Sequence, residues 1–147
     1  QRLTTPHVND IQVLEDRVVI TAETETEPRV IWLDGRGHPA DRSGESPRGH
    51  SIGRWENGVL VVETTQFTPH RRGNGTAIPS GAQKKLTERY ALSEDGAAIR
   101  LDYVLEDPEY LAEPVAHTAI WRYSPQMERV PYSCDREVAG RYLSETP

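Results

Sequence analysis

The sequence predicts an all-β protein, an antiparallel up-and-down barrel of about eight to nine strands in one domain over residues 1–147. Short runs rich in Val, Ile, Tyr and Trp recur at the spacing of barrel strands, and clusters of Gly, Pro, Asn and Asp separate them. Two separators, Asn57-Gly58 and Asp95-Gly96, are typical of two-residue hairpin turns. Only a C-terminal segment, 136–143, has the period of a helix, and we expect a short one there.

Turn residues bound each expected strand. The first two strands flank Glu15-Asp16, and the third ends before a long loop at 35–48. The next two flank Asn57-Gly58, and the following two flank Asp95-Gly96, with a second long loop at 68–83 between these hairpins. A connector bounded by prolines, for which one helical turn is expected, precedes the last pair. The expected strands are 11–14, 17–23, 28–34, 50–56, 59–67, 85–92, 97–106, 115–123 and 128–134.

The Asp95-Gly96 hairpin identifies one candidate functional residue. A two-residue turn fixes the register of its strands, and the register fixes which side chains share a face. A carboxylate at Glu88 then lies in the middle of the apolar face, which is costly unless the group is paired or protonated. Glu88 is therefore either a catalytic acid or base, or a structural residue satisfied by Tyr103 or an inward arginine, unless the register slips and exposes it. The predicted inner-face pairs are Leu92 with Ile99, Tyr90 with Leu101, Glu88 with Tyr103, and Leu86 with Leu105.

The expected strand at 115–123 alternates in the same way. Its Trp and Tyr side chains indicate that one face points inward, and this face includes His117. An inward histidine is either a hydrogen-bonded core residue or a partner of Glu88 in catalysis, and the sequence leaves both interpretations open. The aromatic residues expected to contact a ligand are Tyr90, Trp121, Tyr123 and Tyr132.

The faces of the Asn57-Gly58 hairpin have two assignments. One face carries Trp55, Leu60 and Val62, and the opposite face carries polar candidates. If the Trp55 face is the core, the polar residues form a solvated surface. If Trp55 packs outside the barrel, they line the cavity beside Glu88 as ligand-binding residues. These polar candidates are His50, Arg54 and Glu63.

Composition excludes several classes of function. Lys and Arg number 17 against 23 Asp and Glu, and the net charge of −6 argues against nucleic acid as a partner. No apolar stretch approaches the ~20 residues of a membrane span, so we expect no membrane insertion. The single cysteine, Cys134, excludes an intrachain disulfide and every multi-cysteine metal motif. The sequence also lacks a phosphate-binding glycine loop, a Gly-x-Ser-x-Gly elbow and a His-Glu-x-x-His motif.

Ordered sequence blocks resemble a large family of small, typically exported bacterial proteins of uncharacterised function. The blocks are IWLDGRGHP at 31–39, GHSIGRWENGVLVVETTQF at 49–67, LTERY at 86–90, EDPEY at 106–110 and PYSC at 131–134. This resemblance implies a β-rich domain and a periplasmic or extracellular location, and it implies no activity. Export also fits a chain that begins at Gln1 without an apolar leader. The Gly-x-Trp tripeptide at 53–55 gives a weaker resemblance to lipocalins, members of the calycin group of barrels.

The first functional hypothesis is a cofactor-independent acid–base enzyme that acts on a small, partly apolar molecule inside the barrel. Glu88 would move a proton, His117 would act as the complementary acid or orient the substrate, and Tyr103 would be a hydrogen-bond partner. Isomerisation, elimination or cyclisation fits such a site, and hydrolysis would need a positioned water.

Two alternatives use the same residues differently. A lipocalin-like carrier would bind an apolar ligand in the cavity and keep Glu88 as a structural carboxylate. A metal site of two histidines and one carboxylate, His50 and His117 with Glu63 or Glu88, would suit non-haem iron or zinc. With 35% hydrophobic residues, a small barrel is also expected to form a homodimer.

Overall fold

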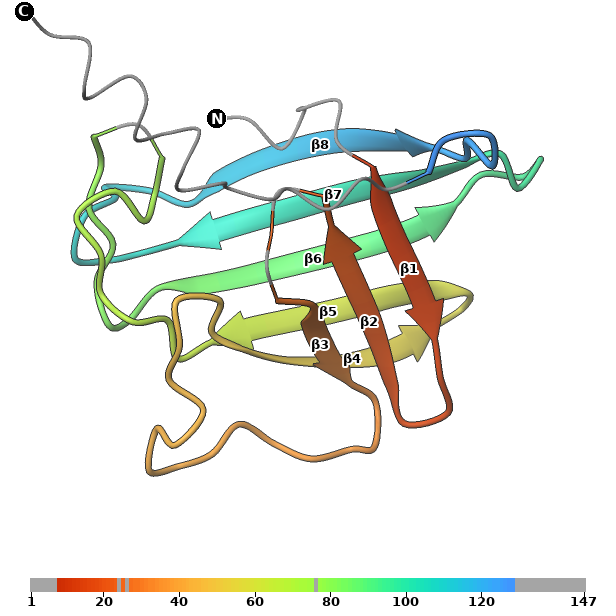
Figure 1. The fold of residues 1–147 in the computed structure, drawn as a ribbon. Helices are drawn as coiled ribbons and strands as arrows, with labels where there is room; N and C mark the ends of the chain where they lie inside the picture. The colour runs from red at the N-terminus through yellow and green to blue at the C-terminus, as the bar shows by residue number, and fades with distance from the viewer. Residues whose placement is uncertain (1–7, 24, 26, 76, 129–147) are drawn as a thin grey trace, which may run out of the picture.

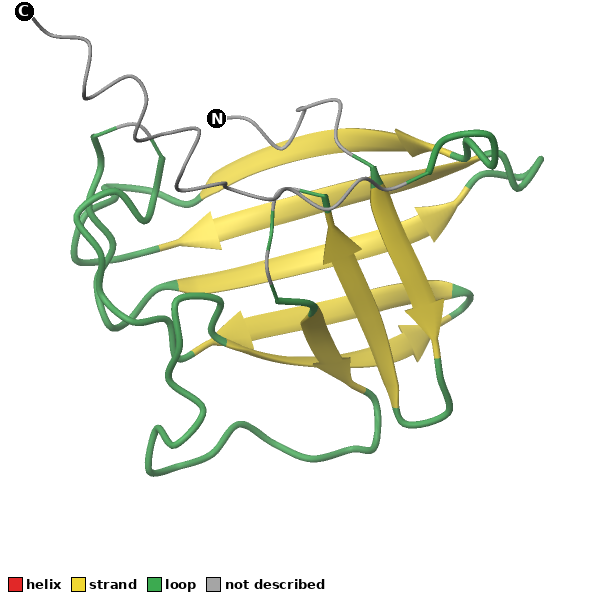
Figure 2. Ribbon diagram, viewed as in Figure 1, coloured by secondary structure: helices red, strands yellow, loops and turns green. Residues whose placement is uncertain are grey.

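The computed structural model describes residues 8–128 except 24, 26 and 76, and these form one curled β-sheet, a half-barrel (Figure 1). The predicted all-β, barrel-like fold is confirmed, and the described residues contain no helix (Figure 2). None of them therefore forms a helix that could cross a membrane. The strands are β1 (Asn9–Val13), β2 (Arg17–Ala22), β3 (Arg29–Trp32), β4 (His50–Glu56), β5 (Val59–Thr65), β6 (Lys85–Leu92), β7 (Ala98–Glu106) and β8 (Val115–Arg122).

The eight strands lie in the sheet in sequence order, and each matches one predicted run. The connector before β8 makes the expected single helical turn, because the amide of Leu111 donates to the carbonyl of Asp107. The predicted ninth strand begins at the last described residue, and the predicted helix at 136–143 lies outside the described residues. Tyr132 and Cys134 fall in the same undescribed part of the chain.

One strand pair departs from the up-and-down prediction. Strands β3 and β4 run parallel, with Ile31 opposite Ser51 and Trp32 opposite Ile52, whereas every other pair is antiparallel. Parallel neighbours need a crossover of a dozen or more residues. The loop at 33–49 supplies it by returning the chain to the end of the sheet at which β3 begins, so the prediction of a wholly antiparallel sheet was wrong at this pair.

The hairpins confirm the predicted registers. Asn57 and Gly58 both have positive φ, 49° and 81°, as a type I′ turn requires, and Glu56 pairs with Val59. The second hairpin has a four-residue loop in place of the predicted two-residue turn, and only Gly96 has positive φ there. The longer loop removes only the predicted pair of Glu94 with Ala97. The remaining pairs, such as Leu92 with Ile99, keep the predicted register. All predicted inner-face pairs of β6 and β7 are present.

The core lies between β1–β3 and the inner face of β4–β8. In Figure 1 the first three strands lie in front of the longer strands and cover part of that inner face. The part of the inner face near the start of β8 lies beside them rather than behind them. The buried core side chains are Val18, Ile20, Ile31, Leu60, Val62, Tyr90, Leu101 and Ala119.

Candidate functional site

Glu88 is buried at the centre of the inner face and is fully paired. Its side chain lies on β6, and the residue is 3% exposed. Arg29, the first residue of β3, extends across the half-barrel, and both of its terminal nitrogens donate hydrogen bonds to the carboxylate. The distance between Nη1 of Arg29 and Oε1 of Glu88 is 2.9 Å, and the hydroxyl of Tyr90 donates to the same oxygen at 2.9 Å. Of the predicted interpretations, this geometry is that of a carboxylate satisfied by an inward arginine.

The remaining donors of Arg29 are also occupied. A guanidinium has five N–H donors, and two of them go to Glu88. Nε donates to Ser51 at 3.2 Å, Nη2 to Thr64 at 2.8 Å and Nη1 to Tyr90 at 3.4 Å. The hydroxyls of Ser51 and Thr64 are themselves 2.8 Å apart. No N–H of Arg29 is therefore left over for a ligand.

Electrostatics keep this network in one protonation state. Burial by itself lowers the pKa of Arg29, but the adjacent Glu88 carboxylate outweighs burial and holds that pKa above its ordinary value. Burial, followed by the Glu88 charge, raises the pKa of Tyr90, so its hydroxyl stays protonated as a donor. The arginine is thus a fixed cation bound to the inner carboxylate.

Sequence reasoning missed Arg29, although a signal for it exists. Arg29 and Ile31 are two residues apart on one strand, so they share a face. Because Ile31 is fully buried, Arg29 must point inward as well. No turn links Arg29 to Glu88, 59 residues away, and only the tertiary fold brings them together.

The predicted catalytic residues share one row of the sheet. Glu88 pairs with Tyr103, and Tyr103 pairs with His117. The rings of Tyr103 and His117 are 5.5 Å apart, and burial, then the charge of Glu88, raises the pKa of Tyr103. Among the described residues no hydrogen bond joins Glu88 to Tyr103 or His117. The row is as predicted, but these side chains do not form one hydrogen-bonded unit.

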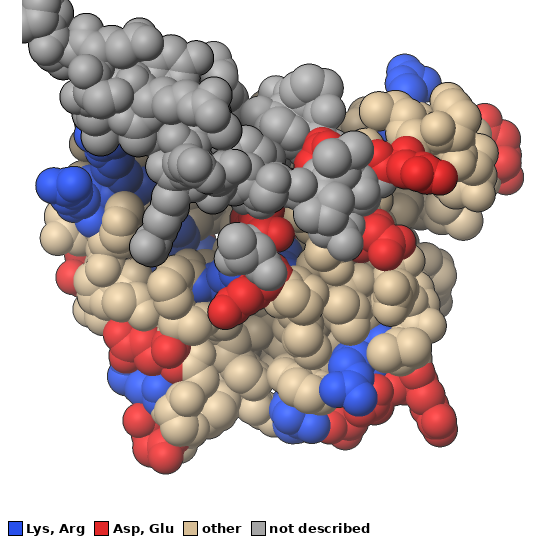
Figure 3. All heavy atoms as spheres, in the orientation of Figure 1, with Lys and Arg blue, Asp and Glu red and all other residues tan. Residues whose placement is uncertain are grey.

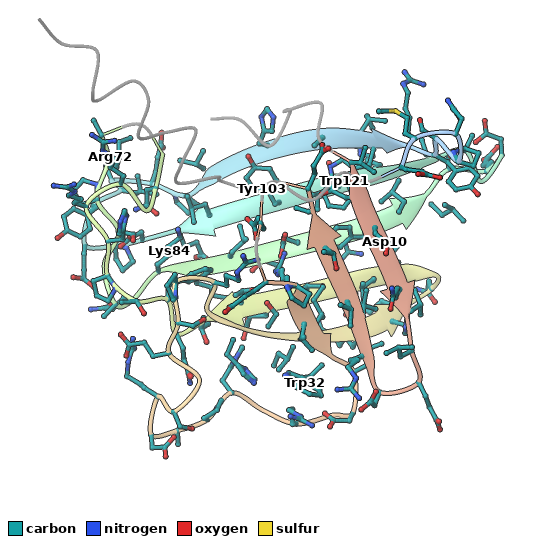
Figure 4. The ribbon with its side chains drawn as sticks, in the orientation of Figure 1. Asp10, Trp32, Arg72, Lys84, Tyr103 and Trp121 are labelled. Carbon is teal, nitrogen blue, oxygen red and sulfur yellow. The ribbon has the colours of Figure 1, made fainter. Side chains whose placement is uncertain are left out.

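The aromatic ligand-binding candidates lie in different places. The ring of Trp121 packs edge-on against Tyr90 at 5.7 Å, on the inner face. Figure 4 shows Tyr103 and Trp121 along the upper strands, near the point where β1 and β2 cross the sheet. Tyr123 follows the end of β8 and is exposed. Trp121 and Tyr103 therefore mark the inner face that a ligand could reach.

His50, Arg54 and Glu63 lie on the opposite face from Glu88. Ser51 alternates with His50 and Arg54 on β4 and belongs to the buried network, so the face of Trp55 is the core face. On β5, Val62 pairs with Glu88, so the neighbouring Glu63 points to the opposite face. Trp55 itself sits at the rim, 53% exposed. Of the two assignments predicted for this hairpin, the structure shows the one in which all three polar residues point outward.

This placement separates the predicted metal ligands. His50 and Glu63 are on the outer face, whereas His117 and Glu88 are on the inner face. Within the described part of the chain, no group of three His, Cys, Asp or Glu side chains is arranged to hold a metal ion. The structure therefore does not assemble the predicted set of two histidines and one carboxylate.

On the outer face, His50 belongs to a cluster with a residue of the long loop. Nδ1 of His38 lies 2.9 Å from Nδ1 of His50. Nε2 of His38 faces Oε1 of Glu63 at 3.4 Å, and the ammonium of Lys85 pairs with the other oxygen of Glu63 at 2.5 Å. Burial, then the nearby His38 and Arg36, lower the pKa of His50. Through His38, the loop at 33–49 thus contacts His50 on β4 and Glu63 on β5.

Two recesses adjoin these groups. One of about 220 Å³ lies where β3 and β4 separate, and its lining includes Arg29, Arg48, His50 and Ser51. The other, of about 460 Å³, opens over β6–β8; Tyr103 and His117 contribute to it together with outer-face residues. Acidic and basic side chains lie side by side along the lower edge of the molecule (Figure 3), as expected of exposed ion pairs.

The lowered pKa of His50 predicts a dependence of stability on pH. In the unfolded chain a histidine titrates near ~6.5. Between that value and the lower folded pKa, the unfolded chain binds more protons, so stability falls as the pH drops through this window. We expect wild type to lose more unfolding free energy than His50→Gln between about pH 7.5 and 5.5, measured by urea unfolding. Equal losses in the two proteins would show that His50 is not held neutral.

We compared the chain with protein families, curated proteins and solved structures. No family model, no curated protein and no solved structure matches the chain. The predicted family, the predicted export and the predicted homodimer therefore stay predictions.

Proposed function

We propose that the protein binds a small, partly apolar molecule on the inner face of the half-barrel, against Tyr103, His117 and Trp121. The observation that carries this proposal is the aromatic and apolar surface of that face beside β1–β3. Tyr103 is half-buried there, and the exposed ring of His117 lies 5.5 Å from it. A barrel of about eight strands can hold one small ligand.

A row of aliphatic residues extends this surface. Leu86, Leu105 and Val115 lie side by side on the inner faces of β6, β7 and β8. The two leucines are only partly buried, and Val115 is 47% exposed. Apolar side chains left accessible on a concave surface, with a few polar groups near them, are typical of ligand sites. The ligand's apolar body would rest on this row, and its polar group would meet His117 or the Tyr103 hydroxyl.

Binding is favoured over catalysis by Glu88 because of the state of that carboxylate. A general base must lie within hydrogen-bond reach of the proton that it takes from the substrate. Glu88 is only 3% exposed. Both oxygens of Glu88 are engaged by Arg29, and one also accepts from Tyr90. The acid–base enzyme remains the alternative proposal, and it requires Arg29 to release Glu88 during turnover.

A matched pair of charge insertions tests the site. Val115 on the inner face and Ile120 on the outer face, 54% exposed, both lie on β8. We expect Val115→Glu to weaken the binding of the anionic apolar probe 1-anilinonaphthalene-8-sulfonate about tenfold or more, which corresponds to ~1.4 kcal/mol. The reason is that a ligand seated on the row would have to desolvate the new carboxylate. Fluorescence titration measures both affinities.

The outer-face control, Ile120→Glu, should change the affinity for the probe less than about twofold. Equal losses in Val115→Glu and Ile120→Glu, or no saturable binding to wild type, would contradict an inner-face site. Urea unfolding of both variants checks that each is folded at the concentrations used.

A further inference from the structure

We propose that His50 is a general acid–base group at the recess between β3 and β4, held in its reactive tautomer by His38 and Glu63. This inference goes beyond ligand binding on the inner face and does not depend on it. Its basis is the chain of contacts on the outer face, from the Glu63 carboxylate through His38 to His50. These contacts determine which ring nitrogen of His50 is free to take a proton.

The contacts determine the tautomers of both rings. Nε2 of His38 is buried and faces a carboxylate oxygen of Glu63 at 3.4 Å, a charge–dipole contact that is not aligned as a hydrogen bond among the described residues. A ring nitrogen in that position carries the proton, because a lone pair there would be repelled by the carboxylate. In neutral His38, Nδ1 is then the acceptor. At 2.9 Å from it, Nδ1 of His50 must be the donor, which leaves Nε2 of His50 with the free lone pair.

Two further features keep this arrangement in place. Lys85 pairs with the second oxygen of Glu63, and this contact is the main reason why the pKa of Glu63 is lowered. Glu63 is therefore ionised at neutral pH. The pKa of His50 is lowered by burial and then by the neighbouring His38 and Arg36, so its ring is neutral under the same conditions. A neutral imidazole with one free nitrogen is the form that acts as a general base.

The recess beside His50 indicates the class of substrate. Its volume of about 220 Å³ is that of a compact molecule rather than an extended one. Arg48 lines it and pairs with Glu25 through side chains that are both substantially exposed. Such an exposed pair contributes little to stability, so a carboxylate on the substrate can replace Glu25 on Arg48. The recess and Arg48 point to a compact carboxylate as the substrate. A general base at His50 would act on such a molecule if it carries a carbonyl group, because the C–H bond next to a carbonyl is the acidic one.

The proton transfer balances within the protein. Nε2 of His50 takes the proton from the carbon beside the carbonyl, and the C–H electron pair forms the enolate. The proton on Nδ1 of His50 passes to Nδ1 of His38, so the positive charge comes to lie beside the carboxylate of Glu63. Return of a proton to the enolate completes an exchange or isomerisation without any oxidant or second reactant. His50 is the catalytic residue here, and His38 and Glu63 are positioning residues.

Ring-nitrogen NMR of the full chain tests the positioning directly. Two-bond correlations between ring protons and ¹⁵N distinguish the two tautomers of a neutral histidine. At about pH 8 we expect His38 to be protonated at Nε2 and His50 at Nδ1. In Glu63→Gln, where no carboxylate fixes the proton, both rings should show mixed tautomers. His50 protonated at Nε2 in wild type, or unchanged tautomers in Glu63→Gln, would overturn the assignment.

Proton exchange with pyruvate as the probe tests the catalysis. We expect the full chain in D₂O to exchange the methyl protons of pyruvate about 100-fold faster than His50→Gln does, as is typical for loss of a general base. The matched control is His70→Gln, because His70 lies in the other long loop and its ring accepts a hydrogen bond from the amide of Arg72. That variant should exchange at the wild-type rate. Equal rates in wild type and His50→Gln would overturn the catalytic role.

Discussion

Glu88→Gln is expected to lower the free energy of unfolding by about 3–5 kcal/mol, the range for removing one partner of a buried ion pair. Arg29 would keep its positive charge in a buried position without its counter-charge, because its pKa lies above the ordinary value. The amide of glutamine can accept one hydrogen bond from Arg29 but not the bidentate pair seen with the carboxylate. Urea unfolding followed by tryptophan fluorescence measures the change.

The matched control for this variant is Glu63→Gln. Glu63 is also ionised on the sheet, but its pair with Lys85 is about one-third exposed, so its loss should cost about 1 kcal/mol or less. The acid–base hypothesis makes the opposite prediction for Glu88. Under that hypothesis Glu88→Gln abolishes turnover and leaves the melting temperature nearly unchanged. Stability equal to wild type would therefore favour that hypothesis.

Gly49→Ala is the second substitution with a large expected effect. Gly49 has φ of +71°, and a Cβ there would lie 2.5 Å from the carbonyl oxygen of Thr65. Positive φ in a residue other than glycine costs about 1–3 kcal/mol. Pushing β4 away from β5 adds an overpacking cost of about 1–3 kcal/mol. We expect Gly49→Ala to lose unfolding free energy through both the positive-φ cost and the overpacking cost. Urea unfolding measures this loss.

Gly35→Ala separates these contributions. Gly35 has φ of +78°, but a Cβ there would meet nothing within 4 Å. This variant should lose only the conformational part, and Gly49→Ala should be less stable than Gly35→Ala by about 1–3 kcal/mol. If the two variants were equally stable, the close approach of Gly49 to the β5 backbone would be contradicted.

The parts of the fold that sequence predicts are those set by local chemistry. Asn57-Gly58 predicted the turn and which residues of β4 and β5 share a face, since positive φ at two successive residues is satisfied by few dipeptides. It did not predict which of the two faces points inward. The register around Asp95-Gly96 was also right, even though the loop is longer than predicted. Through that register, the inward position of Glu88 was predictable from sequence alone.

The parts that sequence did not predict depend on contacts between distant segments. The contact between Arg29 and Glu88 joins β3 to β6 across the curled sheet, and no periodicity in the sequence records it. The parallel pairing of β3 with β4 likewise depends on the path of a long loop. His38 could be placed near a barrel end from its position after β3, but its contact with His50 follows from the same loop path. These long-range contacts decide the role of Glu88.

The central claim is that Glu88 serves the fold by holding Arg29 on the inner face. A double-mutant cycle of Arg29→Met, Glu88→Gln and the combined variant, measured by urea unfolding, tests it most directly. We predict a coupling free energy of about 2–3 kcal/mol, with the combined variant more stable than the sum of the two losses implies. Additive losses, with a coupling below about 0.5 kcal/mol, would show that the two residues act independently and that Glu88 is free for proton chemistry.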